Sequence, residues 1–85
     1  SFRWAEIRMK VDKGRGAQLF WAGKARGFSE PSSARFDIIA DGEFHVYRLD
    51  LDASPAWKGR IGALRLDPCD VRDAHIEVDY IRLVP

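Results

Sequence analysis

Residues 5–11 of the chain read AEIRMKV, and this stretch decides the fold class. Its odd-numbered residues are apolar, whereas its even-numbered residues are charged. A period of two is typical of a β-strand, because successive side chains point to opposite faces of the pleated backbone. We therefore predict an amphipathic strand with one face in a core and the other in solvent.

Five further segments combine apolar, aromatic and β-branched residues and are separated by turn residues: 17–22, 35–39, 43–51, 60–66 and 75–84. Short strands with turn signals about every eight to twelve residues are typical of an antiparallel sandwich. The sequence therefore predicts an all-β fold, an antiparallel β-sandwich of about six strands.

Two of these segments have features beyond their period. Segment 17–22 is apolar or aromatic on both faces, so we expect it to be buried on both sides or to bind a ligand on one. The Asp41-Gly42 pair between 35–39 and 43–51 is a strong hairpin signal, because both residue types tolerate the backbone of a tight turn. We therefore expect those two segments to form a hairpin.

Side-chain alternation also assigns the faces of the two longest segments. The predicted core face of segment 43–51 consists of His45, Tyr47, Leu49 and Leu51. In segment 75–84, strict alternation places Ile76, Val78 and Tyr80 opposite the face of Ile81.

Length, charge and cysteine content limit what the chain can be. Its 85 residues have room for one domain, and because they begin at Ser1 we expect residues 1–85 to be a module excised from a larger protein. The net charge is +1 with no basic stripe, so we expect no nucleic-acid partner. No apolar run approaches the roughly 20 residues of a membrane span. One cysteine, Cys69, excludes a disulfide within the chain.

Four stretches carry a family resemblance: LFWAGKARGFSE (19–30), GEFHVYRLDL (42–51), PAWKGRIGALRLDP (55–68) and IEVDYIRL (76–83). In these stretches the chain resembles the C-terminal half of jelly-roll domains similar to carbohydrate-binding modules. Such modules are attached to secreted bacterial glycoside hydrolases and other polysaccharide-processing proteins. The resemblance implies an extracellular or periplasmic location. It also implies an incomplete jelly roll, because a full one has about eight strands.

Sugar binding needs a flat aromatic ring for the C–H face of a pyranose and planar polar groups for its hydroxyls. The ligand-binding residues that we predict are Trp21, Tyr47, Arg48, Trp57 and Arg65. The competing interpretation is that the aromatic residues fill the core of a small sandwich. Trp57, between Pro55 and Gly59, then forms a lid over the open end of the sandwich.

Three arginines lie in the middle of predicted strands, each two or three residues from an aspartate. The arginines are Arg48, Arg65 and Arg82, and the aspartates are Asp50, Asp67 and Asp79. If the strands align, the guanidinium groups line one sheet face and donate to the hydroxyls or carboxylate of a sugar. The alternative is a solvated face of ordinary ion pairs.

The resemblance also implies a metal site, since an acidic residue on the last strand of such modules often helps to hold a structural calcium ion. Asp79 is that residue in this sequence, and calcium requires about six to eight oxygen ligands. For catalysis the sequence offers little, because His45 and His75 are isolated and Ser29 has no nucleophile-elbow motif around it. We therefore predict that the chain is not an enzyme.

The leading functional hypothesis is a non-catalytic carbohydrate-binding module that brings a parent protein to a polysaccharide or glycan. The alternative is an interaction domain without a sugar site, which packs on a neighbouring domain or on copies of itself. Six strands in place of about eight leave open sheet edges, which favour pairing with another chain. We therefore also expect a homodimer or another homo-oligomer.

Overall fold

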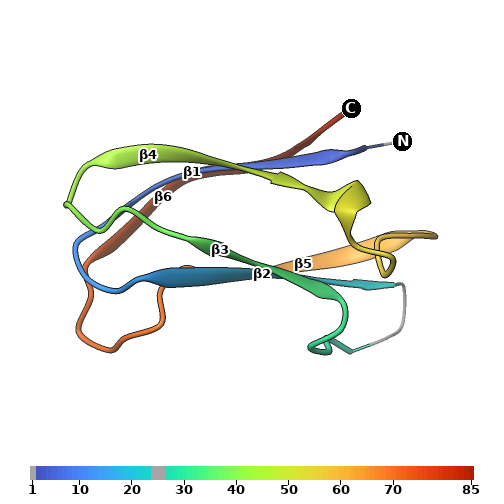
Figure 1. Ribbon diagram of the computed structural model, residues 1–85, viewed down its shortest axis with the longest axis horizontal. Coiled ribbons are helices and arrows are strands. Elements are labelled where there is room, and N and C mark those ends of the chain that lie inside the picture. The colour runs from blue at the N-terminus through green and yellow to red at the C-terminus, as the bar shows by residue number, and fades with distance from the viewer. Residues whose placement is uncertain (1, 24–26) are drawn as a thin grey trace.

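The computed structural model describes residues 2–23 and 27–85 as two antiparallel sheets that pack face to face (Figure 1). The strands are β1 (Trp4–Val11), β2 (Gly16–Gly23), β3 (Ser33–Asp37), β4 (Phe44–Asp50), β5 (Ile61–Asp67) and β6 (Ile76–Val84). Sheet A, the upper layer in Figure 1, has the strand order β4-β1-β6, and sheet B has the order β3-β2-β5. The prediction of an all-β antiparallel sandwich is confirmed.

Strand β1 occupies the middle of sheet A and shows the predicted alternation. Its Glu6 lies opposite Arg48 of β4 on one side and Arg82 of β6 on the other. The apolar side chains of β1 are at most 1% exposed: Ala5, Ile7, Met9 and Val11. Since these residues form the inner face of the sheet, the charged side chains of β1 lie on its outer face.

Strand β2 is buried on both faces, as predicted. Leu19 and Trp21 point into the sandwich and are 0% and 1% exposed, whereas Phe20 on the opposite face is 4% exposed. The guanidinium of Arg65 covers Phe20 from outside at 4.1 Å from the ring centroid. The chain after the strand also returns to β2, where Gln18 donates to Glu30. Residues 24–26 of the predicted surface loop lie outside the described residues.

The core lies between the inner faces of the two sheets. Its largest fully buried side chains are Trp21, Ile7, Met9, Leu19, Leu51 and Val11. They belong to both sheets and to the single 3-10 turn η1 (Leu51–Ala53), so they hold the two layers together. Each such side chain stabilises the fold by about 1.5–3 kcal/mol through burial. The predicted core face of segment 43–51 is confirmed in Leu49 and Leu51, which are 9% and 0% exposed.

The predicted hairpin across Asp41-Gly42 is wrong, because β3 and β4 lie in different sheets. The predicted strand 35–39 is also shifted, since β3 ends at Asp37. Ile38 is instead 9% exposed against the core, and its N–H donates to the carbonyl of Arg15 rather than to a neighbouring strand. Residues 38–43 thus cross from sheet B to sheet A, and the Asp41-Gly42 turn directs the chain into β4.

Strand β6 contains a β-bulge that strict alternation did not predict. Its register advances by two residues, from Tyr80 to Val78, where β1 advances by one, so Asp79 is the extra residue. A bulge shifts the alternation of side chains by one position. Ile76, Val78 and Ile81 therefore share the inner face, and Tyr80 lies on the outer face. The prediction that Ile81 lies opposite Ile76 and Val78 is wrong for this reason.

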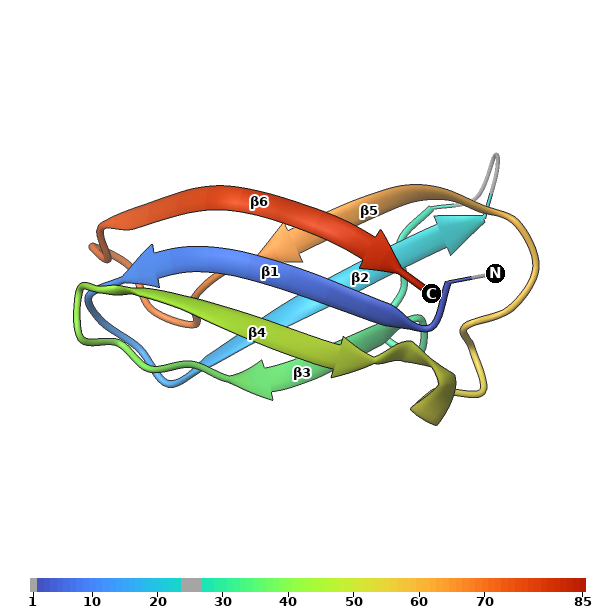
Figure 2. The ribbon, with the colours of Figure 1, turned by 90° about the horizontal axis from the view of Figure 1, so that it is seen from above.

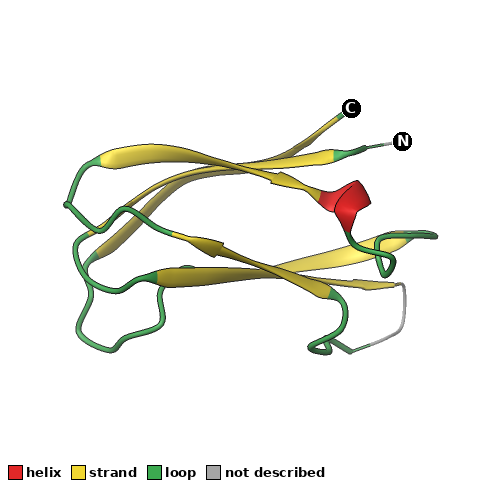
Figure 3. Ribbon diagram, viewed as in Figure 1, coloured by secondary structure: helices red, strands yellow, loops and turns green. Residues whose placement is uncertain are grey.

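One end of the sandwich is closed by η1 and the loop that follows it, drawn in red and green at the right of Figure 3. Leu51 of η1 is fully buried, and its N–H donates to the carbonyl of Arg3 at 2.8 Å. The indole of Trp57 packs against the core.

No helix among residues 2–23 and 27–85 is long and apolar enough to cross a membrane.

Candidate functional site

Four rows of side chains cross the outer face of sheet A, each row with one residue from β4, one from β1 and one from β6. In order along the strands they are Asp50-Trp4-Val84, Arg48-Glu6-Arg82, Val46-Arg8-Tyr80 and Phe44-Lys10-Glu77. They lie together because β1 pairs with both other strands, so every outward residue of β1 has a neighbour on each side. We call these residues the outer face.

The second row places one carboxylate between two guanidinium groups. Glu6 Oε2 accepts from Arg82 Nη2 at 2.7 Å, and Glu6 Oε1 lies 3.7 Å from Arg48 Nε. The Glu6 side chain is only 15% exposed, whereas those of Arg48 and Arg82 are 54% and 59% exposed. The hydrogen bond with Glu6 raises the pKa of Arg82, so its positive charge is secure. The row therefore presents two guanidinium groups to solvent, one hydrogen-bonded to Glu6 and the other 3.7 Å from it.

Trp4 lies beside this row and carries two cations. The guanidinium carbons of Arg3 and Arg48 lie 4.9 and 4.7 Å from the centroid of its ring. Arg3 is itself held by Asp50, to which it donates two hydrogen bonds of 3.2 and 3.1 Å. Arg48 thus contacts both the Trp4 ring and Glu6, and it joins the aromatic part of the outer face to the charged row.

The other two aromatic rings of the outer face also have cations over them. The guanidinium of Arg82 lies 4.8 Å from the ring centroid of Tyr80. Arg8 and Lys10 lie 4.2 and 4.7 Å from that of Phe44. Cation–π pairs of this kind attract the charged groups to the faces of the rings. The outer face therefore combines aromatic rings and guanidinium groups with the carboxylates of Glu6, Asp50 and Glu77.

The structure does not bring the five predicted ligand residues together. Trp21 is 1% exposed and donates from Nε1 to the carbonyl of Ala56, so its ring offers no free face to a ligand. Trp57 packs edge-on against Trp21, with ring centroids 5.3 Å apart. Its Nε1 donates to the carbonyl of Phe2 at 3.1 Å. Both indoles follow the competing interpretation, in which they fill the core and close its end.

Tyr47 points to the inner side of β4. Its hydroxyl accepts a 2.9 Å hydrogen bond from the N–H of Ile39, and its ring lies 5.3 Å from that of Phe36 in sheet B. The residue thus fastens the crossing segment 38–43 to the sandwich. A structural role explains all of these contacts.

The two predicted arginines lie on opposite sides of the molecule. Arg48 belongs to the outer face of sheet A, whereas Arg65 lies over Phe20 on the far side of sheet B. Arg65 also donates to Asp67 at 3.2 Å, which is the ion pair expected from their spacing. The expectation of a single arginine-lined face is therefore wrong for Arg65, but it holds for Arg48 and Arg82.

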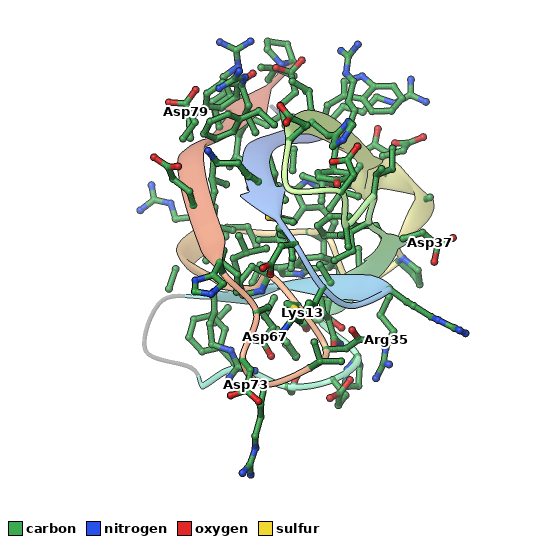
Figure 4. The ribbon with its side chains drawn as sticks, turned by 90° about the vertical axis from the view of Figure 1, so that its left-hand side faces the viewer. Lys13, Arg35, Asp37, Asp67, Asp73 and Asp79 are labelled. Atoms are coloured by element: carbon green, nitrogen blue, oxygen red, sulfur yellow. The ribbon has the colours of Figure 1, made fainter. Side chains whose placement is uncertain are left out.

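Asp79, the predicted calcium ligand, accepts a 2.8 Å hydrogen bond from Arg8 on the outer face. Figure 4 shows Asp79 at the top of the molecule, far from Asp67 and Asp73 at the bottom. Among residues 2–23 and 27–85 no group of three or more His, Cys, Asp and Glu side chains could hold a metal ion. A calcium site at Asp79 stays a prediction.

A second surface feature is a hollow of about 400 Å³ lined by residues of β2, β3 and the end of β5, of which Arg35, Asp37 and Asp67 are labelled in Figure 4. Arg15, Arg35 and Asp70 are among the residues that line it. The Asp70 carboxylate already accepts the N–H of Arg15 at 3.0 Å, and this hydrogen bond lowers its pKa. The Asp70 carboxylate of the hollow is thus already used in a hydrogen bond within the chain, so the outer face is the better candidate for a ligand.

Sequence reasoning missed Trp4, a half-buried aromatic residue beside the charged row. The first strand was expected to begin at Ala5, whereas β1 begins at Trp4. The alternation could have revealed Trp4, because Trp4, like Glu6 and Arg8, is an even-numbered residue and so belongs to the charged face.

The chain was compared with protein-family models, with curated proteins and with solved structures, and none of them matches. What the chain binds must therefore be inferred from the outer face itself.

Proposed function

We propose that this chain is a non-catalytic glycan-binding module, and that the outer face of sheet A binds the sugar. The observation that carries the proposal is the Arg48-Glu6-Arg82 row beside the ring of Trp4. In this proposal the module belongs to a larger extracellular or periplasmic protein. It brings that protein to a polysaccharide.

The chemistry of the row matches that of a sugar. Sugar hydroxyls accept hydrogen bonds from guanidinium groups and donate them to carboxylates, and the row supplies both kinds of partner side by side. The C–H face of a pyranose ring packs on an aromatic ring, which Trp4 supplies once Arg3 or Arg48 moves aside. Both arginines are more than half exposed, so such a movement requires no opening of the core.

The shape of the outer face favours a polymer over a single sugar. In this proposal a chain of sugars lies across the four rows of the sheet face and continues beyond them. Ligand pockets for small molecules are instead concave and enclose most of the ligand surface. The ligand class that fits best is therefore a polysaccharide, neutral or acidic.

The ion pairs of the outer face support a binding role rather than catalysis. A general acid must carry a proton near the working pH. The hydrogen bond from Arg3 instead lowers the pKa of Asp50, and Glu6 accepts its hydrogen bonds from Arg82. The Asp50 carboxyl therefore stays ionised and serves as an acceptor.

Affinity gel electrophoresis tests this proposal. The chain is run through native gels that contain a neutral polysaccharide, such as a β-glucan or xylan, or an acidic one, such as polygalacturonate. We expect retardation in at least one gel and its loss in Arg48→Ala and Arg82→Ala. Arg35→Ala is the matched control, because Arg35 is exposed but lies on sheet B. Equal mobility in every gel would contradict the proposal.

A second candidate function is an interaction domain, favoured by one specific observation. Ile76, Val78 and Ile81 of β6 are each more than a third exposed although they point toward the inner side of the sandwich. A surface of this kind invites a protein partner.

A further inference from the structure

The inner face of β6 is an apolar surface that the sandwich leaves partly uncovered. Ile76, Val78 and Ile81 are 41%, 42% and 37% exposed. Their neighbours on β1, which point the same way, are at most 1% exposed. This difference in exposure reflects where the strands lie in sheet A, since β1 lies between two strands whereas β6 lies at the edge.

Two features leave β6 open. It is an edge strand of sheet A, so one row of its backbone groups has no strand partner among residues 2–23 and 27–85. Strand β5 of the other sheet runs across β6 rather than along it (Figure 2). The apolar side chains of β6 thus extend past the layer that covers the rest of sheet A.

We propose that β6 pairs antiparallel with β6 of a second copy, about a two-fold axis between Asp79 and Tyr80. The two copies of sheet A then form one continuous six-stranded sheet. This dimer goes beyond the function proposed above, and three of its contact residues, Glu77, Tyr80 and Arg82, also belong to the outer face. The proposal rests on which residues of β6 lie on the inner and outer faces of the sheet, and on the opposite charges of residues that would pair across the two copies.

The order of faces along β6 is symmetric about the bulge. Opposite residues of an antiparallel pair share a face of the sheet. The proposed register pairs Ile76 with Leu83 and Val78 with Ile81 on the inner face. On the outer face it pairs Glu77 with Arg82 and Asp79 with Tyr80. In a strand without a bulge this register would place residues of opposite faces together, so the bulge at Asp79 is what allows it.

The charges of the two copies are complementary in this register. Glu77 of each copy lies opposite Arg82 of the other, and the two-fold axis makes two such pairs. Glu77 and Arg82 already form ion pairs with Lys10 and Glu6 of their own chain, and their side chains are still 64% and 59% exposed, so each has room for a partner on another copy. The apolar pairs lie beside them on the inner face. A second copy therefore covers the open edge, the apolar strip and the charges together.

Sedimentation equilibrium on charge variants tests the register. We expect the chain to dimerise at micromolar concentration, with twice the 9.7 kDa mass of one chain. Glu77→Arg alone and Arg82→Glu alone should each weaken the dimer by about tenfold, because like charges then face each other at two positions. A mixture of the two variants should regain it, since the mixed dimer has opposite charges at both positions.

Val78→Thr is a second test that keeps the charges and the strand propensity but reduces the apolar contact, and it should also weaken the dimer. A thermal melt of each variant checks that it is folded. A monomer at micromolar concentration would overturn the proposal. So would a dimer that is unchanged in Glu77→Arg and Arg82→Glu, because its interface would then lie elsewhere.

Discussion

The indole of Trp57 stands edge-on to that of Trp21, with ring centroids 5.3 Å apart and ring planes at 88°. Trp21 belongs to β2 in the core, whereas Trp57 belongs to the loop after η1. Trp21 Nε1 also donates to the carbonyl of Ala56 in that loop. Three contacts of two side chains thus tie the loop to the core and to Phe2 at the start of the described chain.

The first prediction concerns this pair of indoles. In a double-mutant cycle of Trp21→Leu and Trp57→Ala, the two losses of stability should differ from additivity by about 1 kcal/mol. The reason is that an aromatic pair contributes about 0.5–1.5 kcal/mol beyond its buried area. Urea unfolding of the four proteins measures the coupling. Additive losses would show that Trp57 covers the end of the sandwich without a specific contact.

The second prediction concerns the inner face of β4 and η1. Replacing both Leu49 and Leu51 with alanine should unfold the chain, because each buried leucine contributes about 2–5 kcal/mol and a domain has about 5–15 kcal/mol in total. Val46→Ala is the control, since Val46 lies on the opposite face of β4 and is 54% exposed. A cooperative thermal melt in the double variant would mean that the wrong face of this strand was placed in the core.

Much of the fold could be predicted from the period of two. The alternation in residues 5–11 and 43–51 identified β1, β4 and their core faces, because one-sided burial leaves a direct record in the sequence. The pairing of strands leaves no such record. The Asp41-Gly42 turn resembles a hairpin turn locally, but it joins different sheets because the crossing segment is held by contacts with residues far away in the chain, such as Arg15 and Val11.

The bulge in β6 shows the same limit on a smaller scale. Nothing in the letters around Asp79 marks an extra residue, yet it reverses the faces of all the residues on one side of it. For the candidate site, Arg48 and Arg82 were found because charged residues in the middle of strands stand out. Trp21 lies in the core and Trp57 packs against it, which the sequence could not decide because an aromatic side chain serves equally well in a core or on a surface.

The third prediction concerns acid. Hydrogen bonds to the carboxylates of Asp41, Asp50 and Asp70 lower their pKa values, from His45, Arg3 and the backbone of Arg15 respectively. A carboxyl whose pKa is lower in the folded chain stabilises the fold above its unfolded pKa of about 4, and this stabilisation is lost as the pH falls through the folded value. The melting temperature should therefore stay constant between about pH 5 and pH 7, which is above the unfolded pKa of these carboxyls. It should fall steadily below about pH 4.

Asp70→Asn is the variant that tests this cause. An asparagine still accepts the N–H of Arg15 but cannot titrate, so the variant should melt lower at neutral pH and lose less stability on acidification. If its melting temperature falls with pH as steeply as that of the unchanged chain, Asp70 does not contribute to the acid response.

The fourth prediction separates neutral from acidic ligands. Glu6→Gln removes the negative charge that holds Arg48 and Arg82. If the ligand is a neutral polysaccharide, retention should weaken, because the two donors lose their fixed positions. If it is an acidic polysaccharide, retention should strengthen, since the sugar carboxylate no longer competes with Glu6. Retention that does not change in either gel would place the ligand away from this row.

Trp4 provides the most direct test of glycan binding on the outer face. The measurement is the retention of Trp4→Ala in a gel containing the polysaccharide that retards the unchanged chain, beside Phe28→Ala. Phe28 is the matched control, because it is 38% exposed and its ring lies near Arg65 on sheet B. We predict that Trp4→Ala loses at least about tenfold in affinity, as residues at the centre of a binding surface do, with its fold intact by circular dichroism. Full retention of a folded Trp4→Ala, or an equal loss in Phe28→Ala, would contradict a glycan site on this face.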